Sequence, residues 1–310
     1  MAERWSEGNI PDLSERVIMV TGANSGIGYE AARAFAQHGA HVVLACRNRT
    51  KADAAIADIR ASAAEPSVEV LEVDLGDLDS VASAAKQFLS DHDRLDVLVN
   101  NAGLMALPHQ RTAQGFEMQF GVNHLAPFAL TGHLLDRLLA TPGSRVVAVS
   151  STGHRPGQIH FDDLQLEKNY GPWRAYFQSK LANLLFTYEL QRKLAAAGSS
   201  TIATAAHPGG ARTNLGNENP GGIVNTLAHV LHPLINQVMQ PAAMGALPTL
   251  RAAVDPVATG GEYYGPDGIG EQRGYAKRVD STKRSKDLET ARRLWTVSEE
   301  LTGVRYTALD

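Results

Sequence analysis

The stretch TGANSGIG, residues 21–28, decides the fold of this chain. It follows a short apolar run, residues 17–20, and opens a stretch with helical spacing, residues 28–38. A glycine-rich turn between a strand and a helix permits close approach of the backbone to a ligand. The amino terminus of the helix then offers free N–H groups and partial positive charge to a pyrophosphate. The loop therefore predicts a dinucleotide site, and an ordinary tight turn is the alternative.

Short apolar runs alternate with stretches of helical spacing along the rest of the chain. The runs that we expect to form seven strands are residues 17–20, 41–45, 68–73, 95–99, 145–149, 201–205 and 262–264. The stretches that we expect to form helices are residues 28–38, 51–64, 78–91, 116–139 and 174–197. Strands joined by helix-length crossovers pair in parallel. The sequence thus predicts an α/β fold, a doubly wound (Rossmann) seven-stranded parallel sheet.

Length and hydrophobic content favour one domain over residues 1–310. The chain has 310 residues, of which 44% are hydrophobic, and this is enough for one large core. Residues 213–246 break the strand–helix rhythm with GNENPGG and the amphipathic IVNTLAHVLHPLINQVM. We expect this stretch to be a helical lid over the substrate, within the single domain. Its apolar face could instead bind a membrane or a partner helix, or simply pack against the core.

Charge and cysteine content exclude several classes of protein. The net charge of −4 and the pI near 6.3 give no basic excess, so we expect no nucleic-acid partner. Cys46 is the only cysteine, which rules out an intramolecular disulfide and favours a reducing compartment. No signal peptide and no run of about 18 apolar residues is present, so we expect no transmembrane segment and a cytoplasmic location.

The end of the second predicted strand bears on which dinucleotide binds. An NAD site usually places an acidic residue about 20 residues after the glycine loop, where it binds the ribose 2′-hydroxyl. No carboxylate lies between Glu30 and Asp53, whereas Arg47, Arg49 and Lys51 follow the strand. These cations suit a 2′-phosphate and favour NADP(H) over NAD(H). Ordinary solvated loop charges are the alternative.

Two further strand ends carry residues suited to a flat ligand. The third strand ends in Asp74-Leu75, where an adenine ring could be held, and the fourth ends in NNAG, residues 100–103. Small residues after a strand let the backbone lie against such a ligand.

Tyr176 and Lys180 lie four residues apart in the predicted helix over residues 174–197. This spacing places both side chains on one helical face. A nearby ammonium can stabilise a phenolate and lower the pKa of the tyrosine from about 10 towards the working range. Taken alone, the spacing is far more typical of a pair on a helix surface.

Together and in this order, the motifs resemble the short-chain dehydrogenase/reductase family. The matching motifs are TGANSGIG, Asp74-Leu75, NNAG, Asn123 within GVNHLAPF, VSS at 149–151, YFQSK at 176–180 and PGGART at 208–213. The resemblance covers residues 17 to about 279. It is closest to the retinol-dehydrogenase and protochlorophyllide-reductase-like branch, and four stretches carry that match: ACRN, FDDLQLEKNY, SKLANLLF and the HPG at 207–209.

The resemblance implies an NADP(H)-dependent oxidoreductase that transfers hydride between nicotinamide and a carbonyl or alcohol. It makes Tyr176 the general acid in reduction and the base in oxidation. Lys180 lowers the pKa of Tyr176 and holds the nicotinamide ribose, and Ser151 hydrogen-bonds the substrate oxygen. Asn123 steadies Lys180 and an ordered water for proton relay. The residues implied to bind the cofactor, besides Tyr176 and Lys180, are Gly22, Asn24, Ser25, Gly26, Ile27, Gly28, Arg47, Asp74, Leu75, Asn101, Ala102, Gly103, Pro208, Gly209 and Thr213.

Two expectations rest on details of the branch pattern. The second serine of the pair, Ser151 rather than Ser150, is expected to act on the substrate. The interval from Ser151 to Tyr176 is longer than is usual in the family. An insertion there favours a monomer or homodimer over the common tetramer.

The lid composition and the branch favour an apolar aldehyde, ketone or alcohol as the small-molecule substrate. A non-catalytic NADP(H)-binding redox sensor is the second hypothesis. Such a sensor has no need to keep all four residues Asn123, Ser151, Tyr176 and Lys180. Light-driven reduction, a third possibility, needs a pigment partner for which the sequence shows no distinctive site.

No metal site is expected from the spacing of the histidines. His229 and His232 lie three apart, and His154 and His160 flank the insertion, but neither pair has an evident carboxylate neighbour. The segments before about residue 15 and after residue 283 contain no motif to which a catalytic or binding role can be assigned, and we expect both to be structural.

Overall fold

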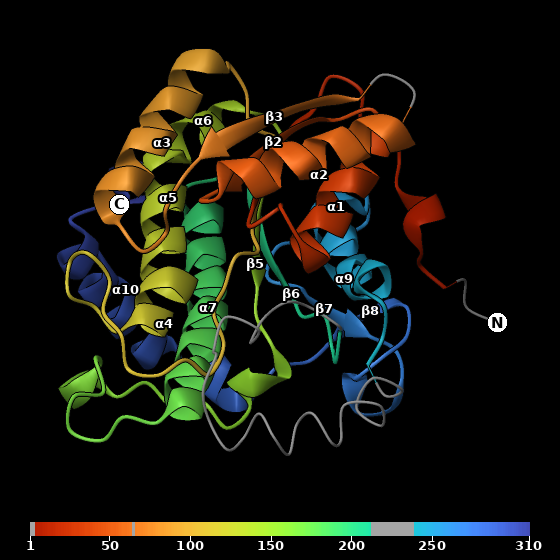
Figure 1. The fold of residues 1–310 in the computed structure, drawn as a ribbon. Coiled ribbons are helices and arrows are strands. Elements are labelled where there is room, and N and C mark those ends of the chain that lie inside the picture. The colour runs from red at the N-terminus through yellow and green to blue at the C-terminus, as the bar shows by residue number, and fades with distance from the viewer. Residues whose placement is uncertain (1–3, 64–65, 212–238) are drawn as a thin grey trace.

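A single mixed sheet forms the middle layer of the molecule, with helices on both faces (Figure 1). The computed structural model describes residues 4–63, 66–211 and 239–310, and within them the sheet has eight strands. The strand order is β3-β2-β1-β4-β5-β6-β7-β8. The strands are β1 (Val17–Thr21), β2 (His41–Cys46), β3 (Ser67–Glu72), β4 (Val97–Asn100), β5 (Arg145–Val149), β6 (Ile202–Ala206), β7 (Tyr263–Pro266) and β8 (Ala276–Val279).

The predicted doubly wound fold is confirmed, but the predicted number of strands was wrong by one. Strands β1 to β7 pair in parallel, and β8 pairs antiparallel with β7, with Tyr263 opposite Val279. The prediction missed β8 because its sequence, AKRV, has no apolar run and exposes its lysine and arginine. A short, charged edge strand of this kind protects the sheet from pairing with another chain.

Helices with one apolar face cover the two sides of the sheet. On one side of the sheet, a hydrophobic core contains buried residues from α1 (Gly26–Gln37), α2 (Arg49–Ser62) and α9 (Ala242–Val254). Residues from α3 (Leu78–Asp91), α5 (Ala126–His133) and α7 (Pro172–Ala196) contribute to the other core. No helix within the described residues combines the length and the apolar character that a membrane span requires.

Several predicted segments take a different form in the structure. The stretch predicted as one helix, residues 116–139, is divided into α4 (Met118–Phe120), a π-helical turn (Gly121–Leu125), α5 and α6 (Leu135–Ala140). The last helix is α10 (Leu288–Thr302). Short 3₁₀ turns complete the described chain at Glu7–Asn9, Thr152–His154, Phe161–Asp163, Ile269–Glu271, Lys283–Lys286 and Thr307–Leu309.

Most of the expected lid lies outside the described residues. Residues 212–238, with Thr213, His229 and His232, are not among them. The end of the stretch, from Ala242, belongs to α9, which packs against α1. Gly245 makes this contact close, because a Cβ there would lie 2.6 Å from Ala211 Cβ and 3.4 Å from Ile27 Cγ1.

The carboxyl-terminal segment is part of the core, as expected. Trp295 of α10 stacks on Phe186 at a ring-centroid distance of 5.9 Å and meets Phe128 edge-on at 5.2 Å. Tyr306 lies 4.6 Å from Trp295, and its hydroxyl donates to the Phe128 carbonyl oxygen at 2.7 Å. These aromatic contacts join α10 to the helices that support the site.

We expect Trp295→Ala to lower the free energy of unfolding by about 3–5 kcal/mol, because it empties a buried aromatic site. Urea unfolding of the purified chain measures this loss. Arg292→Ala, on the exposed face of α10, is the control and should change stability by less than about 0.5 kcal/mol. Equal stabilities of the two variants would contradict a core role for α10.

Candidate active site

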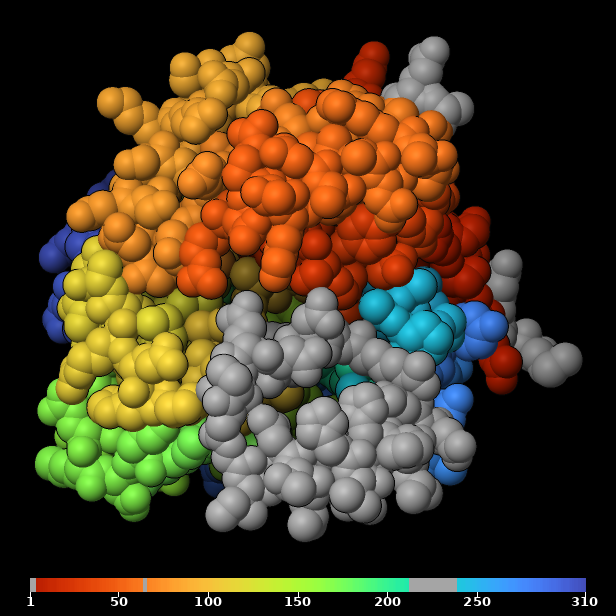
Figure 2. Space-filling view, in the orientation of Figure 1, coloured from red at the N-terminus to blue at the C-terminus, as the bar shows by residue number. Residues whose placement is uncertain are grey.

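The candidate site lies at the carboxyl ends of the central strands. The order of the sheet reverses between β1 and β4, because the chain proceeds from β1 to β2 on one side and from β4 to β5 on the other. In open α/β sheets, ligands bind in the crevice at such a switch point. Figure 2 shows the surface hollowed beside the orange-red atoms of the first strand–helix units.

The glycine loop is shaped by two residues with left-handed backbone. Gly22 has φ +66° and Gly26 has φ +57°, which other residues adopt only with strain. Gly22 N–H donates to the Ala45 carbonyl oxygen at 2.8 Å, which fixes the start of the turn. Ser25 is the N-cap of α1 and makes no side-chain cap bond within the described residues. The first N–H groups of α1 therefore have no intrahelical partner and suit an anion.

The loops after β1 and β4 are hydrogen-bonded to each other through Thr21. Its Oγ1 accepts from the backbone N–H groups of Asn101 and Ala102, each at 3.0 Å. The Asn101 side chain returns a bond from Nδ2 to the Thr21 carbonyl oxygen at 2.8 Å. A Cβ on Gly28 would lie 2.4 Å from Asn101 Nδ2, so only glycine fits there. The sequence analysis did not single out Thr21, although it is the first residue of the glycine motif.

Asn123 lies in the π-helical turn and is completely buried. Its Oδ1 accepts from Leu104 N–H at 2.7 Å, and its Nδ2 donates to the Leu104 carbonyl oxygen and to Ser179 Oγ, both at 2.9 Å. Gly103 packs beside this amide: a Cβ there would lie 3.2 Å from both Asn123 Oδ1 and Lys180 Nζ. Single π-turns of this kind are frequent at functional sites. The NNAG loop, Asn123 and Lys180 thus meet at one point.

Lys180 is buried on the same face of α7 as Tyr176. Its Nζ lies 5.8 Å from the centre of the Tyr176 ring and donates to the Val149 carbonyl oxygen at 3.1 Å. Burial lowers the pKa of Lys180 to about 8. The ammonium form is therefore present at neutral pH and is lost as the pH rises through about 8.

Ser151 lies beside the phenol of Tyr176. A Cβ on Gly153 would be 3.0 Å from Tyr176 Cε1 and 3.4 Å from Ser151 Oγ, so the glycine lets the two side chains approach. Burial raises the pKa of Tyr176, and a side-chain hydrogen bond with Ser151 opposes this shift. The Tyr176/Lys180 spacing predicts a lowered pKa for Tyr176 because of the Lys180 charge. In the structure, removal of the phenol from water is the larger effect.

Ser150 faces away from this pair. Its Oγ donates to the Lys180 carbonyl oxygen at 2.7 Å, and its side chain is buried. Its hydroxyl ties the end of β5 to α7. The two adjacent serines therefore have different surroundings, and Ser151 is the one beside Tyr176.

The cations after β2 differ in how they are paired. Arg49 forms an ion pair with Asp53 at 2.9 Å within α2. The side chain of Arg47 is 68% exposed, and its Nη1 lies 4.0 Å from Asp74 Oδ2. Asp74 also accepts from Gly76 N–H at 2.8 Å, which holds the turn after β3, and Leu75 is buried. Arg47 and Asp74 thus lie together at the carboxyl ends of β2 and β3, on the same side of the sheet as the glycine loop.

The segment after β6 is held by two glutamines that the sequence analysis did not identify. Gln240 Nε2 donates to the Pro208 carbonyl oxygen at 2.8 Å. Gly209 has φ +64°, and a Cβ there would lie 2.5 Å from the Gln272 carbonyl oxygen. No local motif marks these glutamines, because they approach from distant parts of the chain. Thr213, expected at the end of this segment, lies outside the described residues.

Comparison with known proteins identifies the family of this chain. The profile of the short chain dehydrogenase family matches residues 16–221. The chain belongs to this family. The predicted family and the retinol-dehydrogenase-like branch are both confirmed, and the chain is an oxidoreductase of that family.

Its relatives and structural neighbours are similar over most of their length. Retinol dehydrogenase 12 and retinol dehydrogenase 13 of Homo sapiens are each 39% identical to this chain, over 95% and 93% of it and 88% and 85% of their own lengths. The crystal structure of an uncharacterised protein from Mycobacterium paratuberculosis is 42% identical, with a TM-score of 0.81, and the match covers 98% of this chain and 99% of that one. A short chain dehydrogenase from Shigella flexneri 2a complexed with NADP is 26% identical, with a TM-score of 0.62, over 81% of this chain and 97% of that one.

The two serines give a matched test of the site. We expect Ser151→Ala to lower kcat/KM by about a hundredfold or more, because it removes a donor beside Tyr176. Ser150→Ala should leave kcat/KM within a few-fold and lower stability by about 1 kcal/mol, because it loses the bond to α7 and keeps Ser151 beside Tyr176. Steady-state kinetics and urea unfolding of both variants measure this. The reverse pattern would assign the substrate contact to Ser150.

Proposed function

We propose that this chain is an NADP(H)-dependent oxidoreductase that transfers hydride between nicotinamide and an apolar aldehyde, ketone or alcohol. The observation that carries the proposal is the convergence of Asn123, Ser151, Tyr176 and Lys180 at the carboxyl ends of the strands, beside the glycine loop. A buried phenol, a hydroxyl and an ammonium in one place are suited to carbonyl reduction, which needs a proton for the oxygen.

The glycine loop and the NNAG loop fit a dinucleotide. The first turn of α1 offers unpaired N–H groups to a pyrophosphate, and Gly22, Asn24, Ser25, Gly26, Ile27 and Gly28 would hold it. Asp74, Leu75, Asn101, Ala102 and Gly103 would contact the adenosine half. Pro208 and Gly209 would border the nicotinamide, with Thr213 beyond them. When bound, the nicotinamide gives or takes the hydride.

Arg47 supports NADP(H) over NAD(H). Its guanidinium is exposed at the end of β2, and no carboxylate stands between Glu30 and Asp53 to bind a free 2′-hydroxyl. A guanidinium matches the geometry of a phosphate. The NADP complex of the Shigella flexneri 2a relative agrees with this choice.

Tyr176 and Ser151 handle the oxygen of the substrate. Burial keeps the Tyr176 phenol protonated at neutral pH, so that it can give its proton to the oxygen as hydride reaches the carbon. Ser151 donates a hydrogen bond to the same oxygen and holds it beside the phenol. In oxidation the two groups act in reverse, with the tyrosine accepting the proton.

Lys180 and Asn123 support the proton transfer. The Lys180 ammonium stabilises the phenolate that remains when Tyr176 has given up its proton. Asn123 is held by Leu104 and Ser179, so its amide has one orientation beside Gly103 and Lys180. From there it would steady an ordered water that returns a proton to the tyrosine.

The apolar substrate is proposed from the relatives and the composition of the expected lid. The names of the human relatives specify retinol, a long apolar alcohol, as the substrate of those proteins. Residues 213–246 carry an amphipathic stretch that would cover a substrate of similar character.

Mixing the chain with NADPH and a series of aldehydes and ketones of increasing apolar length tests the function. We expect loss of NADPH absorbance that is faster with the longer, apolar members. Tyr176→Phe should lower kcat by about 10²–10⁴-fold while NADPH still binds, because the ring stays in place and the acid is removed. Tyr188→Phe is the control, since Tyr188 lies on the same helix and, among the described residues, its hydroxyl bonds Ser281.

NADPH binding with no turnover across the whole series would contradict the proposal. That outcome would favour a redox sensor, which needs the cofactor site and not the proton donor.

The cofactor preference is tested separately through Arg47. We expect tighter binding of NADPH than of NADH, and we expect Arg47→Ala to weaken NADPH binding by about tenfold or more, with NADH unaffected. Arg49→Ala is the control, because Asp53 already pairs with that guanidinium. Isothermal titration of both cofactors measures this. Equal or tighter binding of NADH by the unaltered chain would remove the argument for NADP(H).

A further inference from the structure

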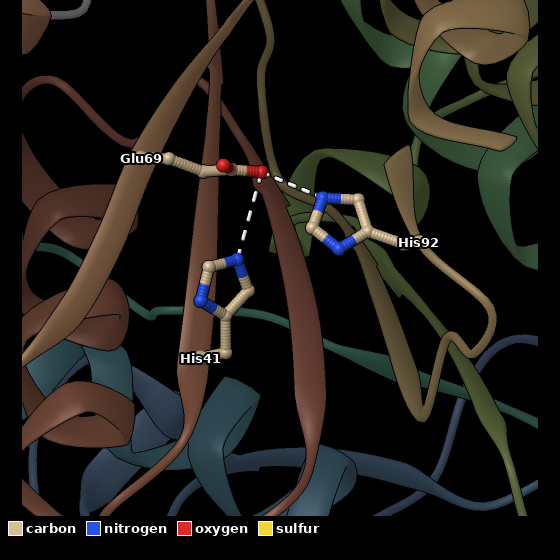
Figure 3. Close-up of side chains that lie close together, drawn as sticks. All are labelled: His41, Glu69 and His92. Atoms are coloured by element: carbon tan, nitrogen blue, oxygen red, sulfur yellow. Dashed lines mark hydrogen bonds and ion pairs between the residues drawn. The ribbon is translucent and has the colours of Figure 1, made fainter. Parts of the chain in front are cut away.

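Two histidines and a glutamate meet near the edge of the sheet, away from the candidate active site. His41 is the first residue of β2, Glu69 lies in β3, and His92 is the C-cap of α3. Figure 3 shows the three side chains pointing toward one another from these elements. His41 enters at the amino end of its strand, whereas the crevice for the dinucleotide lies at the carboxyl ends.

The strand register brings the first two side chains to one face. His41 pairs with Ser67, and Glu69 is two residues further along β3. Residues two apart in a strand point to the same side, and this is the side covered by α3. His92 reaches the same place from the end of that helix. The ring of His92 is fixed by stacking on Phe88, at a centroid distance of 4.6 Å.

The ligand atoms of the three residues are close enough to share one ion. Among the described residues, one nitrogen of each histidine and one Glu69 oxygen all lie within 4.8 Å of one another. Glu69 Oε1 is 2.7 Å from His92 Nε2 and 3.5 Å from His41 Nε2. Ligands 2.0–2.1 Å from a tetrahedral ion are separated by about 3.3 Å, so modest side-chain adjustments would fit them around it.

His41 has an unused nitrogen that faces the cluster. Its Nδ1 shares a hydrogen bond of 2.7 Å with Ser67 Oγ, which fixes the ring. Its Nε2 is shielded from solvent and has no hydrogen-bond partner among the described residues, although Glu69 Oε1 lies 3.5 Å away. A buried polar atom without a partner is uncommon in a native protein. A hydrogen bond from the other ring nitrogen is the usual support of a metal-binding histidine.

We propose that His41, Glu69 and His92 form a binding site for one divalent transition-metal ion of the Zn²⁺ type. Two imidazoles and a carboxylate are a ligand set that zinc accepts, with water as the fourth ligand. His41 would bind through Nε2 with its Nδ1–H donated to Ser67. His92 would bind through Nε2 after its proton moves to Nδ1.

The site is accessible and its charge is suitable. The side chains of His41, Glu69 and His92 are 26%, 44% and 13% exposed, so solvent reaches the cluster mainly at Glu69, while His41 Nε2 itself is shielded. Arg137 is a nearby cation, since it donates to the His92 carbonyl oxygen, and Asp93 lies 3.4 Å from its guanidinium. Glu69 supplies the negative charge that favours a cation between the two imidazoles.

The ion would fasten the edge of the sheet. β3 is the last strand on its side, and its outer edge has no neighbouring strand within the described residues. One ion held by β2, β3 and the end of α3 joins three elements that are far apart in the sequence. Its effect is on stability, because the site lies at the other end of β2 from the glycine-loop crevice.

Isothermal titration of the full chain, purified without a histidine tag, with Zn²⁺ alone tests the proposal. We expect one ion per chain and a rise in Tm of a few degrees. His41→Ala and His92→Ala should each weaken binding by about a hundredfold or more and abolish the rise in Tm. Glu69→Gln keeps the shape of a partly exposed side chain and should also weaken binding, which covers the case in which a histidine variant fails to fold.

The double variant His229→Ala/His232→Ala is the matched control, because these two histidines lie three apart in the sequence and are not among the three proposed ligands. It should bind Zn²⁺ as the unaltered chain does. Co²⁺ gives a second readout, since a four-coordinate site with histidine ligands produces strong visible absorption, which His41→Ala should remove. The proposal is overturned if the unaltered chain binds no Zn²⁺, or if either single histidine variant binds it equally well.

Discussion

The Thr21 hydroxyl provides the contact on which the site depends. It receives the N–H groups of Asn101 and Ala102, and so joins the loop after β1 to the loop after β4 at the point where the order of the sheet reverses. Gly28 and Asn101 then pack without space for a side chain between them. Because the two loops are fixed to each other, the glycine turn and the NNAG segment form two walls of one crevice. Asn123 and Lys180 are placed relative to it through Gly103.

Burial sets the pKa values of Tyr176 and Lys180, the two residues of α7 proposed to handle the proton. Tyr176 is kept protonated because the phenolate would be poorly solvated, and the same environment lowers the pKa of Lys180 to about 8. An acid that is protonated at neutral pH beside a cation that still carries its charge suits reduction of a carbonyl. Ser150 fastens this helix to β5, and Ser151 faces the phenol. In the proposed mechanism, Ser150 therefore anchors the helix and Ser151 contacts the substrate.

The sequence predicts the parts that are encoded locally. The glycine turn, the strand ends and the Tyr176/Lys180 spacing are short patterns, and the structure brings them together as one site. β8 could not be predicted because an edge strand needs no apolar face. The π-turn around Asn123 could not be predicted either, because its sequence pattern does not differ from that of an α-helix. The pKa of Tyr176 depends on how deeply the phenol is buried, and the hydrophobic periodicity of the sequence does not give that depth. His41, Glu69 and His92 come from three separate elements, so only the strand register reveals them.

In the proposed mechanism, Tyr176 gives its proton to the substrate oxygen with support from the Lys180 charge. The pH dependence of kcat/KM for carbonyl reduction tests it most directly. The folded pKa of Lys180 is lowered, so its charge is present below about 8 and lost above it, while the raised pKa of Tyr176 keeps the phenol protonated to higher pH. We expect kcat/KM to fall as the pH rises through about 8, with the loss of one proton. A rate that stays constant from pH 7 to beyond about 10, where an ordinary lysine titrates, would contradict it.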